Sequence, residues 1–555
     1  MKKMTPWMII IGVLALLSTA ALMVLFGRQM LVPESAAPAA QVFIPPAEHQ
    51  YPTPTHFSPT TPTPTLLPPA VWLDPALPAD FRDGIKIPAG IRLSKDPDRA
   101  VIHLSLGEEN PVRRWVYALA APFPTVTDGF SRQELETAWQ GDPPADFQGS
   151  PLLLTEDTLA VFQALWGEPA DGAVKVAAAE DLSELAWAER PSWALLPFEE
   201  LDPSWKVLAV DGVSPLDKDF QAAGYPLAVS ISLAGDLPGG MILAPSNRDP
   251  EKLTTVMLTG VTALVRATAW TMEMEGLEYP ARDIQDWLVT ADILHISNEV
   301  PFVRGCPYPN PSQSDLKFCS HPKYIRLLET IGTDVVELTG DHFGDYGPLA
   351  MLNTLELYDL REWPYYGGGA TRQEAQQPVL FEHNGNRIAF LGCNAKGGGY
   401  ATAGPDQPGA VACDFDQITA AVEDLTRQGY LVIGTFQHFE YYTYAAQPDQ
   451  IRDAARLTDA GAVIVSGSQA HQPQGFEIKE GAFVHHGLGN LFFDQIYEIP
   501  PNTATAFIDR HVFYDGRHIS TELLTIRFED YARARPMTTQ ERETLLETVF
   551  RASGW

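Results

Sequence analysis

The chain has 555 residues, too many for one hydrophobic core, so two or three domains are expected. It carries 70 acidic and 38 basic residues, a formal net charge of −32. This argues against nucleic acid as a partner, because binding to phosphates needs clustered lysine and arginine. The acidic surface suits a soluble exported protein, and it would repel an anionic polymer unless a cation bridged the two.

The N-terminus predicts a membrane anchor. It opens with Met-Lys-Lys, followed by an uncharged apolar run from Trp7 to Phe26. Roughly twenty apolar residues in a helix span a hydrocarbon core of about 30 Å. The lysines are expected to stay in the cytoplasm, which makes the protein single-pass and places its bulk outside the cell membrane. A cleaved signal peptide with a small-residue site at Ser18–Ala20 is the alternative. The apolar run continues through Leu22–Phe26, which favours an uncleaved anchor within residues 1–30.

A spacer and an α/β domain are predicted next. Residues 31–70 are rich in proline, threonine and alanine. Because proline fixes φ and removes a backbone donor, this stretch is expected to be stiff and extended. From residue 71 to 250, strand-like runs such as Val101–Leu106 alternate with helical stretches such as Glu156–Trp166. This alternation predicts an α/β domain.

Two segments of that domain, Tyr117–Ser131 and Leu195–Leu216, resemble extracytoplasmic solute-binding proteins of the phosphate-binding type. Such proteins hold a small anion with helix N-termini and hydroxyl groups. The resemblance implies this role for a turn with Thr125, Thr127, Asp128 and Ser131. The region is shorter than a complete binding protein, so a truncated fold used for contact or spacing is an equal alternative.

Disulfides are expected beyond residue 300. The four cysteines are Cys306, Cys319, Cys393 and Cys413. An exported chain can form disulfides, and four cysteines allow three pairings. We expect neighbours in sequence to pair, Cys306 with Cys319 and Cys393 with Cys413. Neither spacing resembles a zinc knuckle, so these thiols are not expected to bind a metal.

Six sequence blocks beyond Lys252 place polar residues directly after apolar, strand-like runs. They are TGVTALVR at 259–266, SNEVPF at 297–302, TGDHFGDYG at 339–347, QHFEYY at 437–442, GSQAHQPQ at 467–474 and GLGNLFFDQ at 487–495. Histidine and carboxylate side chains at strand ends suit a cage for a transition metal.

In this order the blocks resemble the CapA family, the capsule or poly-γ-glutamate synthesis proteins on the calcineurin-like metallophosphoesterase fold. That family carries GD, N-x-E, N-N-H, H-W-G, G-H-x-H and SLGNF. The resemblance covers about residues 254–495. It implies a metallophosphoesterase-like α/β/β/α sandwich over residues 251–535, followed by a C-terminal helix over 536–555.

The resemblance also implies a metal site. The metal ligands that it implies are Glu299, Asp341, His438 and His471, with Gln469 as a weak or indirect one. It assigns the role of the catalytic histidine, which supplies a proton to the leaving group, to His342.

Two of the family's metal donors are altered. Val261 stands where the family has a ligand aspartate, and Gln469 stands where it has the first histidine of G-H-x-H. One divalent ion (Mn, Zn or Fe) is therefore expected in place of two. Arg266, Asn298 and Asn490 match or neighbour family positions and are candidates for substrate binding.

Two functions follow from the resemblance. The first is a membrane-anchored, metal-dependent hydrolase that acts in the synthesis of capsule, poly-γ-glutamate or a related surface polymer. The second, favoured by the changes at Val261 and Gln469, is a non-catalytic module that binds polymer or helps to assemble a capsule complex. The expected partners are an anionic surface polymer or membrane proteins of capsule synthesis.

Overall fold

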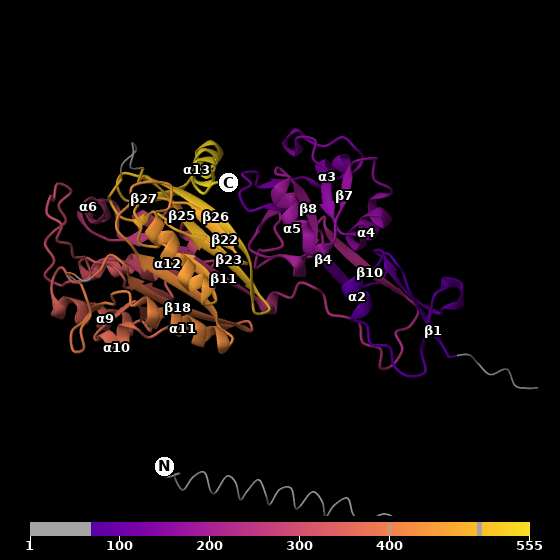
Figure 1. Ribbon diagram of the computed structural model, residues 1–555, viewed down its shortest axis with the longest axis horizontal. Coiled ribbons are helices and arrows are strands. Elements are labelled where there is room, and N and C mark those ends of the chain that lie inside the picture. The colour runs from indigo at the N-terminus through magenta and orange to yellow at the C-terminus, as the bar shows by residue number, and fades with distance from the viewer. Residues whose placement is uncertain (1–67, 398, 400, 497–501) are drawn as a thin grey trace, which may run out of the picture. The chain divides into compact units, whose positions relative to one another are not determined.

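The computed structural model of this chain describes residues 68–397, 399, 401–496 and 502–555 (Figure 1). The predicted anchor, with its apolar run Trp7–Phe26, and the spacer as far as residue 67 lie outside the described residues. Within the described ranges, no helix is both long enough and apolar enough to cross a membrane.

The first sheet has ten strands and lies between residues 70 and 234. Its main path runs β2-β1-β3-β10-β4-β8-β6-β7, and β9 pairs with both β4 and β5. The strands are β1 (Ala70–Leu73), β2 (Arg92–Ser94), β3 (Ile102–Leu106), β4 (Pro111–Pro122), β5 (Gly129–Phe130), β6 (Leu152–Leu154), β7 (Val174–Val176), β8 (Trp193–Pro197), β9 (Trp205–Val210) and β10 (Ala228–Ala234). The helices of this region are α2 (Ala79–Asp83), α3 (Arg132–Trp139), α4 (Glu156–Trp166) and α5 (Ala179–Ala188). The predicted α/β class of this region is thus confirmed.

Two larger sheets follow. The nine-stranded sheet runs β15-β14-β13-β11-β25-β26-β27, with β12 between β13 and β24. Its strands are β11 (Leu253–Thr259), β12 (Val261–Thr262), β13 (Ile293–Asn298), β14 (Val335–Glu337), β15 (Tyr365–Tyr366), β24 (Asn490–Phe492), β25 (Thr505–Tyr514), β26 (Arg517–Glu529) and β27 (Arg533–Pro536). The six-stranded sheet runs β17-β18-β20-β21-β23-β22. Its strands are β17 (Val379–His383), β18 (Asn386–Asn394), β20 (Leu431–Gln437), β21 (Ala462–Ser466), β22 (Phe476–Lys479) and β23 (Ala482–His485).

The remaining elements are a short strand pair and eight helices among the described residues. The strands are β16 (Gly368–Gly369) and β19 (Gly409–Ala410). The helices are α6 (Arg266–Glu275), α7 (Gln285–Leu288), α8 (Ile325–Thr330), α9 (Pro348–Asp359), α10 (Arg372–Ala375), α11 (Phe415–Arg427), α12 (Pro448–Asp459) and α13 (Thr539–Ala552).

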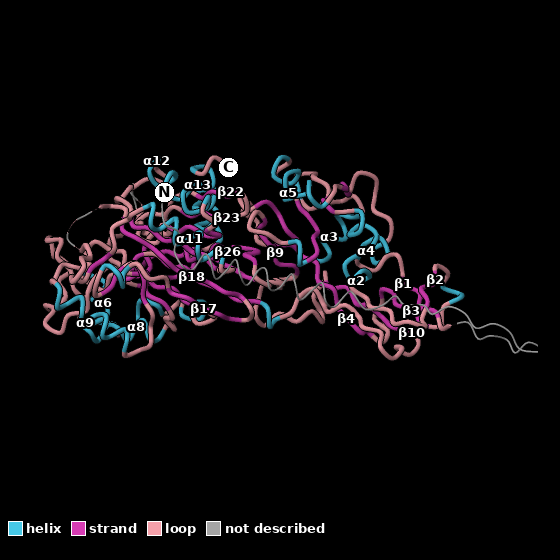
Figure 2. The backbone as a smooth tube through the Cα atoms, turned by 60° about the horizontal axis from the view of Figure 1, so that its bottom comes forward, coloured by secondary structure: helices cyan, strands magenta, loops and turns pink. Residues whose placement is uncertain are grey.

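Alternation along the strands sorts the residues of each sheet between its two faces. In β11, Val256 and Leu258 face the other sheet, whereas Met257 packs with the apolar residues of α6, α8 and α9. In β20, Ile433 joins the core between the sheets, and Val432 packs with residues of α11 and α12. Figure 2 shows α6, α8 and α9 below the strands and α12 above them. The layers are helix, sheet, sheet, helix, which confirms the predicted α/β/β/α sandwich.

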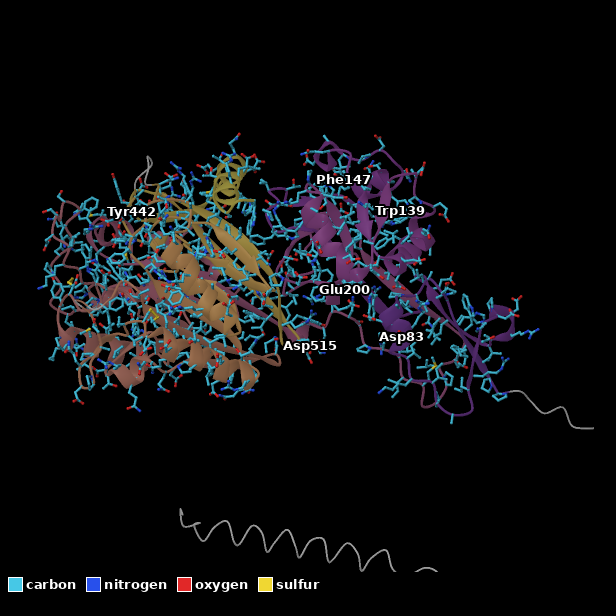
Figure 3. All side chains as sticks on the ribbon, viewed as in Figure 1. Asp83, Trp139, Phe147, Glu200, Tyr442 and Asp515 are labelled. Atoms are coloured by element: carbon cyan, nitrogen blue, oxygen red, sulfur yellow. A yellow bond between two sulfur atoms is a disulfide. The ribbon has the colours of Figure 1, made fainter. Side chains whose placement is uncertain are left out.

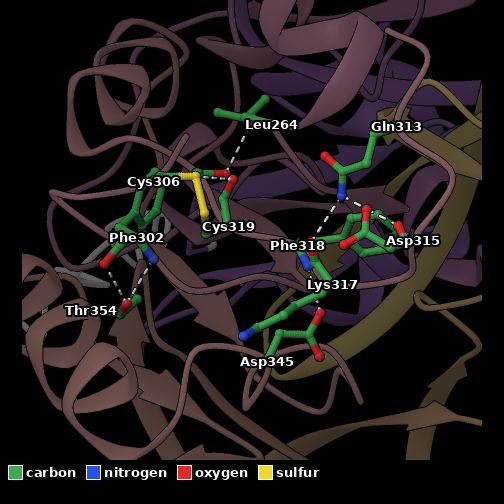
Figure 4. The surroundings of a disulfide bond; sticks show 11 residues. Leu264, Phe302, Cys306, Gln313, Asp315, Lys317, Phe318, Cys319, Asp345 and Thr354 are labelled. Atoms are coloured by element: carbon green, nitrogen blue, oxygen red, sulfur yellow. Dashed lines mark hydrogen bonds between the residues drawn. A yellow bond between two sulfur atoms is a disulfide. The ribbon is translucent and has the colours of Figure 1, made fainter. Parts of the chain in front are cut away.

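Both predicted disulfides are confirmed. Cys306 is bonded to Cys319, and Cys393 is bonded to Cys413. The first bond closes a loop whose last residues, Lys317 and Phe318, lie near Asp345 (Figure 4). The backbone N–H of Phe318 donates a hydrogen bond to Oδ2 of Asp345 at 2.7 Å. The disulfide therefore restrains a segment that leads directly to the polar residues described below.

The turn at residues 125–131, expected to bind an anion, is held by partners inside the protein. Ser131 caps α3, and the carboxylate of Glu134 accepts hydrogen bonds from the backbone N–H and the hydroxyl of Ser131 at 2.7 and 2.8 Å. A carboxylate thus already lies at the helix N-terminus, where an anion would bind. Asp128 pairs with Arg542 of α13 at 2.9 Å. The turn links the first sheet to the C-terminal helix, and the structure does not support the anion-binding role.

Two histidines in the core of the sandwich predict a loss of stability in acid. Burial lowers the pKa of His518 to about 3 and that of His511 well below its ordinary value. Both are neutral in the folded protein, whereas the unfolded chain gains a proton at each below about pH 6.5. The free energy of unfolding is therefore expected to fall below that pH by about 1.4 kcal/mol per pH unit for each histidine.

Denaturant unfolding at about pH 7 and about pH 5 measures this effect. The His518→Gln variant should show a smaller loss between the two pH values than the wild type. His383, whose side chain is 39% exposed, supplies a control for the same substitution outside the core. Equal losses in the wild type and the His518→Gln variant would contradict the assignment.

Candidate metal centre

Polar side chains converge where parallel strands of both sheets end. Glu299 follows β13, Asp341 lies four residues beyond β14, and Glu440 lies three residues beyond β20. Gln469 and His471 follow β21. Strands β13 and β14 pair in parallel, as do β20 and β21. Because parallel strands present their carboxyl ends at one edge of a sheet, residues far apart in the chain meet there.

Glycines allow these segments to approach closely. A Cβ atom on Gly340 would lie 2.9 Å from the Cα atom of Glu299, and one on Gly467 would lie 1.9 Å from the carbonyl oxygen of His486. Both distances are too short for any side chain. The glycines of the TGDH and GSQAH blocks are thus required by the close contact between neighbouring strand ends.

Three side chains form a group that could hold a metal ion. Glu299, Asp341 and His342 each offer a ligand atom, and these atoms lie within 4.8 Å of one another. Glu299 is 1% exposed, and neither of its carboxylate oxygens has a hydrogen-bond partner among the described residues. Burial raises its pKa. An ionised carboxylate without a partner is costly to bury, so this donor set fits a bound cation.

Asp341 is held by two further side chains. Its carboxylate accepts hydrogen bonds from Nζ of Lys396 at 2.6 Å and from Nε2 of Gln437 at 2.9 Å. Burial raises its pKa, but the hydrogen bond from Lys396 and the charges of His342 and Lys396 outweigh this and lower it below its ordinary value. Asp341 is therefore an ionised oxygen donor.

His342 is oriented as a proton donor. Its Nδ1 lies 2.8 Å from Oδ2 of Asp345, and its ring lies 4.7 Å from that of Phe318. Burial lowers its pKa, but the bond to Asp345 and the charge of Glu299 raise it to about 9. The imidazolium form holds a proton on each nitrogen, so Nε2 of His342 can donate to a bound molecule.

His471 presents a free nitrogen to the same region. Its Nδ1 lies 2.9 Å from Oδ1 of Asn490, and the amide nitrogen of Asn490 donates to the carbonyl oxygen of Gln495 at 3.2 Å. This second bond fixes the amide so that its oxygen faces His471, which places the proton on Nδ1. The lone pair is then on Nε2, which lies 4.0 Å from Oε1 of Glu440. A histidine held in this way is well suited to bind a metal.

His438 lies away from the group. Its Nδ1 and Nε2 lie 3.9 Å from carboxylates of Asp449 and Asp453, both on α12. The preceding residue, Gln437, reaches Asp341 instead. Neighbouring residues at the end of a strand point to opposite sides, so only one of the two can face Asp341. The structure therefore does not bring His438 together with Glu299 and Asp341.

Gln469 and Val261, which replace two of the family's metal donors, lie in different surroundings. The amide nitrogen of Gln469 donates to the hydroxyl of Ser297 at 2.6 Å, and its buried oxygen has no partner among the described residues. That oxygen could serve as a weak donor to a cation. Val261 is fully buried in an apolar cluster with Phe318 and Phe493. It supplies packing where the family supplies a carboxylate.

The groups expected to bind substrate have partners of their own. The guanidinium of Arg266 contacts Asp494 and lies 4.9 and 5.0 Å from the rings of Phe318 and Phe493. The amide nitrogen of Asn298 donates to the hydroxyl of Tyr358 at 2.8 Å. Asn490 orients His471, as described above. The side chains of these three residues thus contact other residues of the protein. Their roles in substrate binding stay predictions.

Three residues of this site are not among the predicted site residues. Lys396 lies two residues beyond β18, Gln437 ends β20, and Glu440 is contacted at 3.1 Å by the hydroxyl of Tyr442, which is labelled in Figure 3. A lysine soon after an apolar strand was the available signal for Lys396. Nothing in the local sequence shows that its ammonium reaches Asp341, because 55 residues separate the two.

Comparison with known proteins places a family match on this part of the chain. The family model of the bacterial capsule synthesis protein PGA_cap matches residues 255–495. Capsule biosynthesis protein CapA of Bacillus anthracis is 25% identical over 254 residues, which are 45% of this chain and 62% of that protein. PGA biosynthesis protein CapA of Bacillus subtilis is 24% identical over 186 residues, 33% of this chain and 49% of that protein. The chain thus spans between about half and two thirds of the length of these curated relatives.

Solved structures give a weaker likeness. A 5'-nucleotidase precursor of Thermus thermophilus has a TM-score of 0.34 and 14% identity, over 53% of this chain and 58% of that chain. An ABC-type phosphate transport receptor of Vibrio cholerae has a TM-score of 0.23 and 10% identity, over 27% of this chain and 76% of that chain. Values this low carry no argument about function. The solute-binding character of the N-terminal domain therefore stays a prediction.

Proposed function

We propose that this protein acts in the synthesis of a capsule or polyglutamate-type surface polymer. The basis is that its residues 255–495 belong to the bacterial capsule synthesis family PGA_cap, and that the chain is similar to CapA proteins of two Bacillus species. The proposal places the globular part outside the cell membrane, anchored through residues 1–30. The two disulfides support an extracytoplasmic location, because disulfides persist in oxidising compartments.

The proposed activity is metal-dependent hydrolysis at the group around Glu299. The observation that carries it is the buried carboxylate of Glu299, whose two oxygens have no partner among the described residues and lie beside Asp341 and His342. Glu299, Asp341 and His471 offer oxygen and nitrogen donors of the kind that first-row divalent ions prefer. A divalent ion held there would supply Lewis acidity and hydroxide at neutral pH.

The protein's own residues then have distinct tasks. Glu299, Asp341 and His471 would hold the ion, and Asn490 fixes the ring of His471 for this task. His342 would supply the proton on its Nε2 to the leaving group. Asp345 fixes the ring of His342 at 2.8 Å and favours its protonated form. The substrate class of this proposal is a surface polymer or a precursor attached to it. Its partners are that polymer or membrane proteins of capsule synthesis.

A non-catalytic module is the second candidate. It is favoured by the apolar cluster around Val261 and by the separation of His438 from the other predicted ligands. In this case the domain would keep the fold and bind polymer or assembly partners without turnover. The two candidates differ in their dependence on Glu299 and His471. In a strain without its own copy, folded and exported Glu299→Gln and His471→Ala proteins should fail to restore surface polymer if hydrolysis is required.

Metal content tests the hydrolase proposal directly. The full-length chain, purified in detergent, loaded with Mn²⁺, Zn²⁺ or Fe²⁺ and dialysed, should retain about one equivalent of metal per chain. The same sample treated with a chelator is the control. Less than about a tenth of an equivalent with every metal would contradict the proposal, because the ligands described above should keep the ion bound during dialysis.

A further inference from the structure

Lys396 is the one lysine of the described residues whose ammonium touches the candidate metal centre. It lies beyond β18, in the loop closed by the Cys393–Cys413 disulfide. Its Nζ lies 2.6 Å from Oδ2 of Asp341 and 3.2 Å from Oε1 of Glu440. Its side chain is 26% exposed, so the ammonium is only partly hydrated.

The two carboxylates that meet this ammonium come from different sheets. Asp341 lies beyond β14, and Glu440 lies beyond β20. Two carboxylates directed at one point repel each other unless a cation lies between them. Glu440 is also near Nε2 of His471 and accepts a hydrogen bond from the hydroxyl of Tyr442. The ammonium of Lys396 supplies the cation.

Asp341 therefore belongs to two groups of polar side chains. The first contains the carboxylate oxygens of Glu299, which have no partner among the described residues, and the ring of His342. The second contains Glu440 and the ammonium of Lys396. Two-metal hydrolytic sites hold two cations about 3.5–4 Å apart. Here one of the two cations is part of the protein.

We propose that the ammonium of Lys396 takes the place of a second metal ion, so that this site binds a single divalent cation. This inference rests on the proposed metal centre. Lysine suits the role because its ammonium is a compact point charge with three donors, two of which are used by Asp341 and Glu440. The valine at position 261, where the family has an aspartate, is consistent with this proposal. A site with one carboxylate fewer can balance the positive charge of fewer metal ions.

Replacing Lys396 with methionine tests the proposal. The change keeps the length of the side chain and removes its charge, which leaves the carboxylates of Asp341 and Glu440 facing each other. The carboxylates of Asp341 and Glu440 can then bind Mn²⁺. The side-chain oxygen of Asn394, which accepts a hydrogen bond from the backbone N–H of Lys396 at 3.0 Å, adds a third donor.

The measurement is the number of Mn²⁺ ions retained by the full-length chain after loading and dialysis, together with its electron paramagnetic resonance spectrum. We expect about one ion in the wild type and about two in Lys396→Met, with spin coupling between the ions only in the variant. Lys252→Met is the matched control, because Lys252 forms an exposed ion pair with Asp515 at 3.0 Å, and it should retain about one ion. The double variant Lys396→Met/Glu440→Gln should return to about one, since the second position loses a carboxylate.

The outcomes separate this inference from the proposed function. One ion in both the wild type and Lys396→Met, or two ions in both, would overturn the role of Lys396 and leave the metal centre standing. No ion in any protein would overturn the metal centre, and the inference with it. If Lys396→Met does not fold without added metal, Mn²⁺ should restore a folded protein that holds two ions. Failure of this rescue would also contradict the proposal.

Discussion

Glu299→Gln is expected to weaken metal binding by at least about 100-fold, since even residues that only support a ligand contribute about 10- to 100-fold. The substitution keeps the shape of the side chain and removes the charge that a cation requires. Metal-free Glu299→Gln should be at least as stable as the metal-free wild type, because it no longer buries an unpaired carboxylate. Metal titration followed by calorimetry measures the first effect, and thermal unfolding in chelator measures the second.

Glu337→Gln is the matched control for that experiment. Glu337 is also fully buried, but its carboxylate is paired with His295 at 3.1 Å and accepts a hydrogen bond from Thr339 at 2.6 Å. Replacing this carboxylate leaves its buried hydrogen-bond partners poorly satisfied, which costs about 1–3 kcal/mol, so this variant should be less stable. Its metal affinity should not change. A loss of stability in metal-free Glu299→Gln as large as that in Glu337→Gln would show that Glu299 is a structural residue.

His471→Ala is expected to reduce metal affinity by about 10- to 100-fold or more, whereas His438→Ala should leave it unchanged. The difference follows from their positions. His471 presents Nε2 toward Glu440 with its other nitrogen held by Asn490, while His438 faces the carboxylates of α12. Asn490→Ala should give a smaller loss than His471→Ala, because it frees the ring without removing the ligand.

These two variants distinguish the ligand set that includes His438, implied by the family motifs, from the set without it that the geometry gives. Metal affinity of the full-length variants is measured under one set of conditions, with circular dichroism to show that each is folded. Equal losses in His471→Ala and His438→Ala would favour the ligand set implied by the family motifs. A loss in His438→Ala alone would contradict the geometry described here.

Much of the fold could be predicted because it depends on local patterns. The six blocks after apolar runs identified the strands that end at the site, and they matched the family segment 255–495. The pairing of Cys306 with Cys319 and of Cys393 with Cys413 was expected from closeness in sequence. The helix at the C-terminus was expected as well, and α13 spans Thr539–Ala552.

Which side chain of each block faces the site could not be predicted from the sequence. The block QHFEYY contains both Gln437 and His438, and the family motif pointed to the histidine. In the structure, Gln437 faces Asp341, because adjacent residues of a strand point to opposite sides and a shift of one residue exchanges them. A motif aligns residues by type, whereas the register of the strand decides which of them faces the site.

By itself, the sequence determined the charge balance, the apolar N-terminal run, the order of strands and helices, and the supply of histidines and carboxylates at strand ends. These properties are local, since periodicity and composition act over a few neighbouring residues. Only the tertiary structure decided that Lys396 reaches Asp341, that Arg266 is held by Asp494, and that Glu299 is left without a partner among the described residues. Such contacts join residues far apart in the chain, and packing of the two sheets against each other brings them within bonding distance.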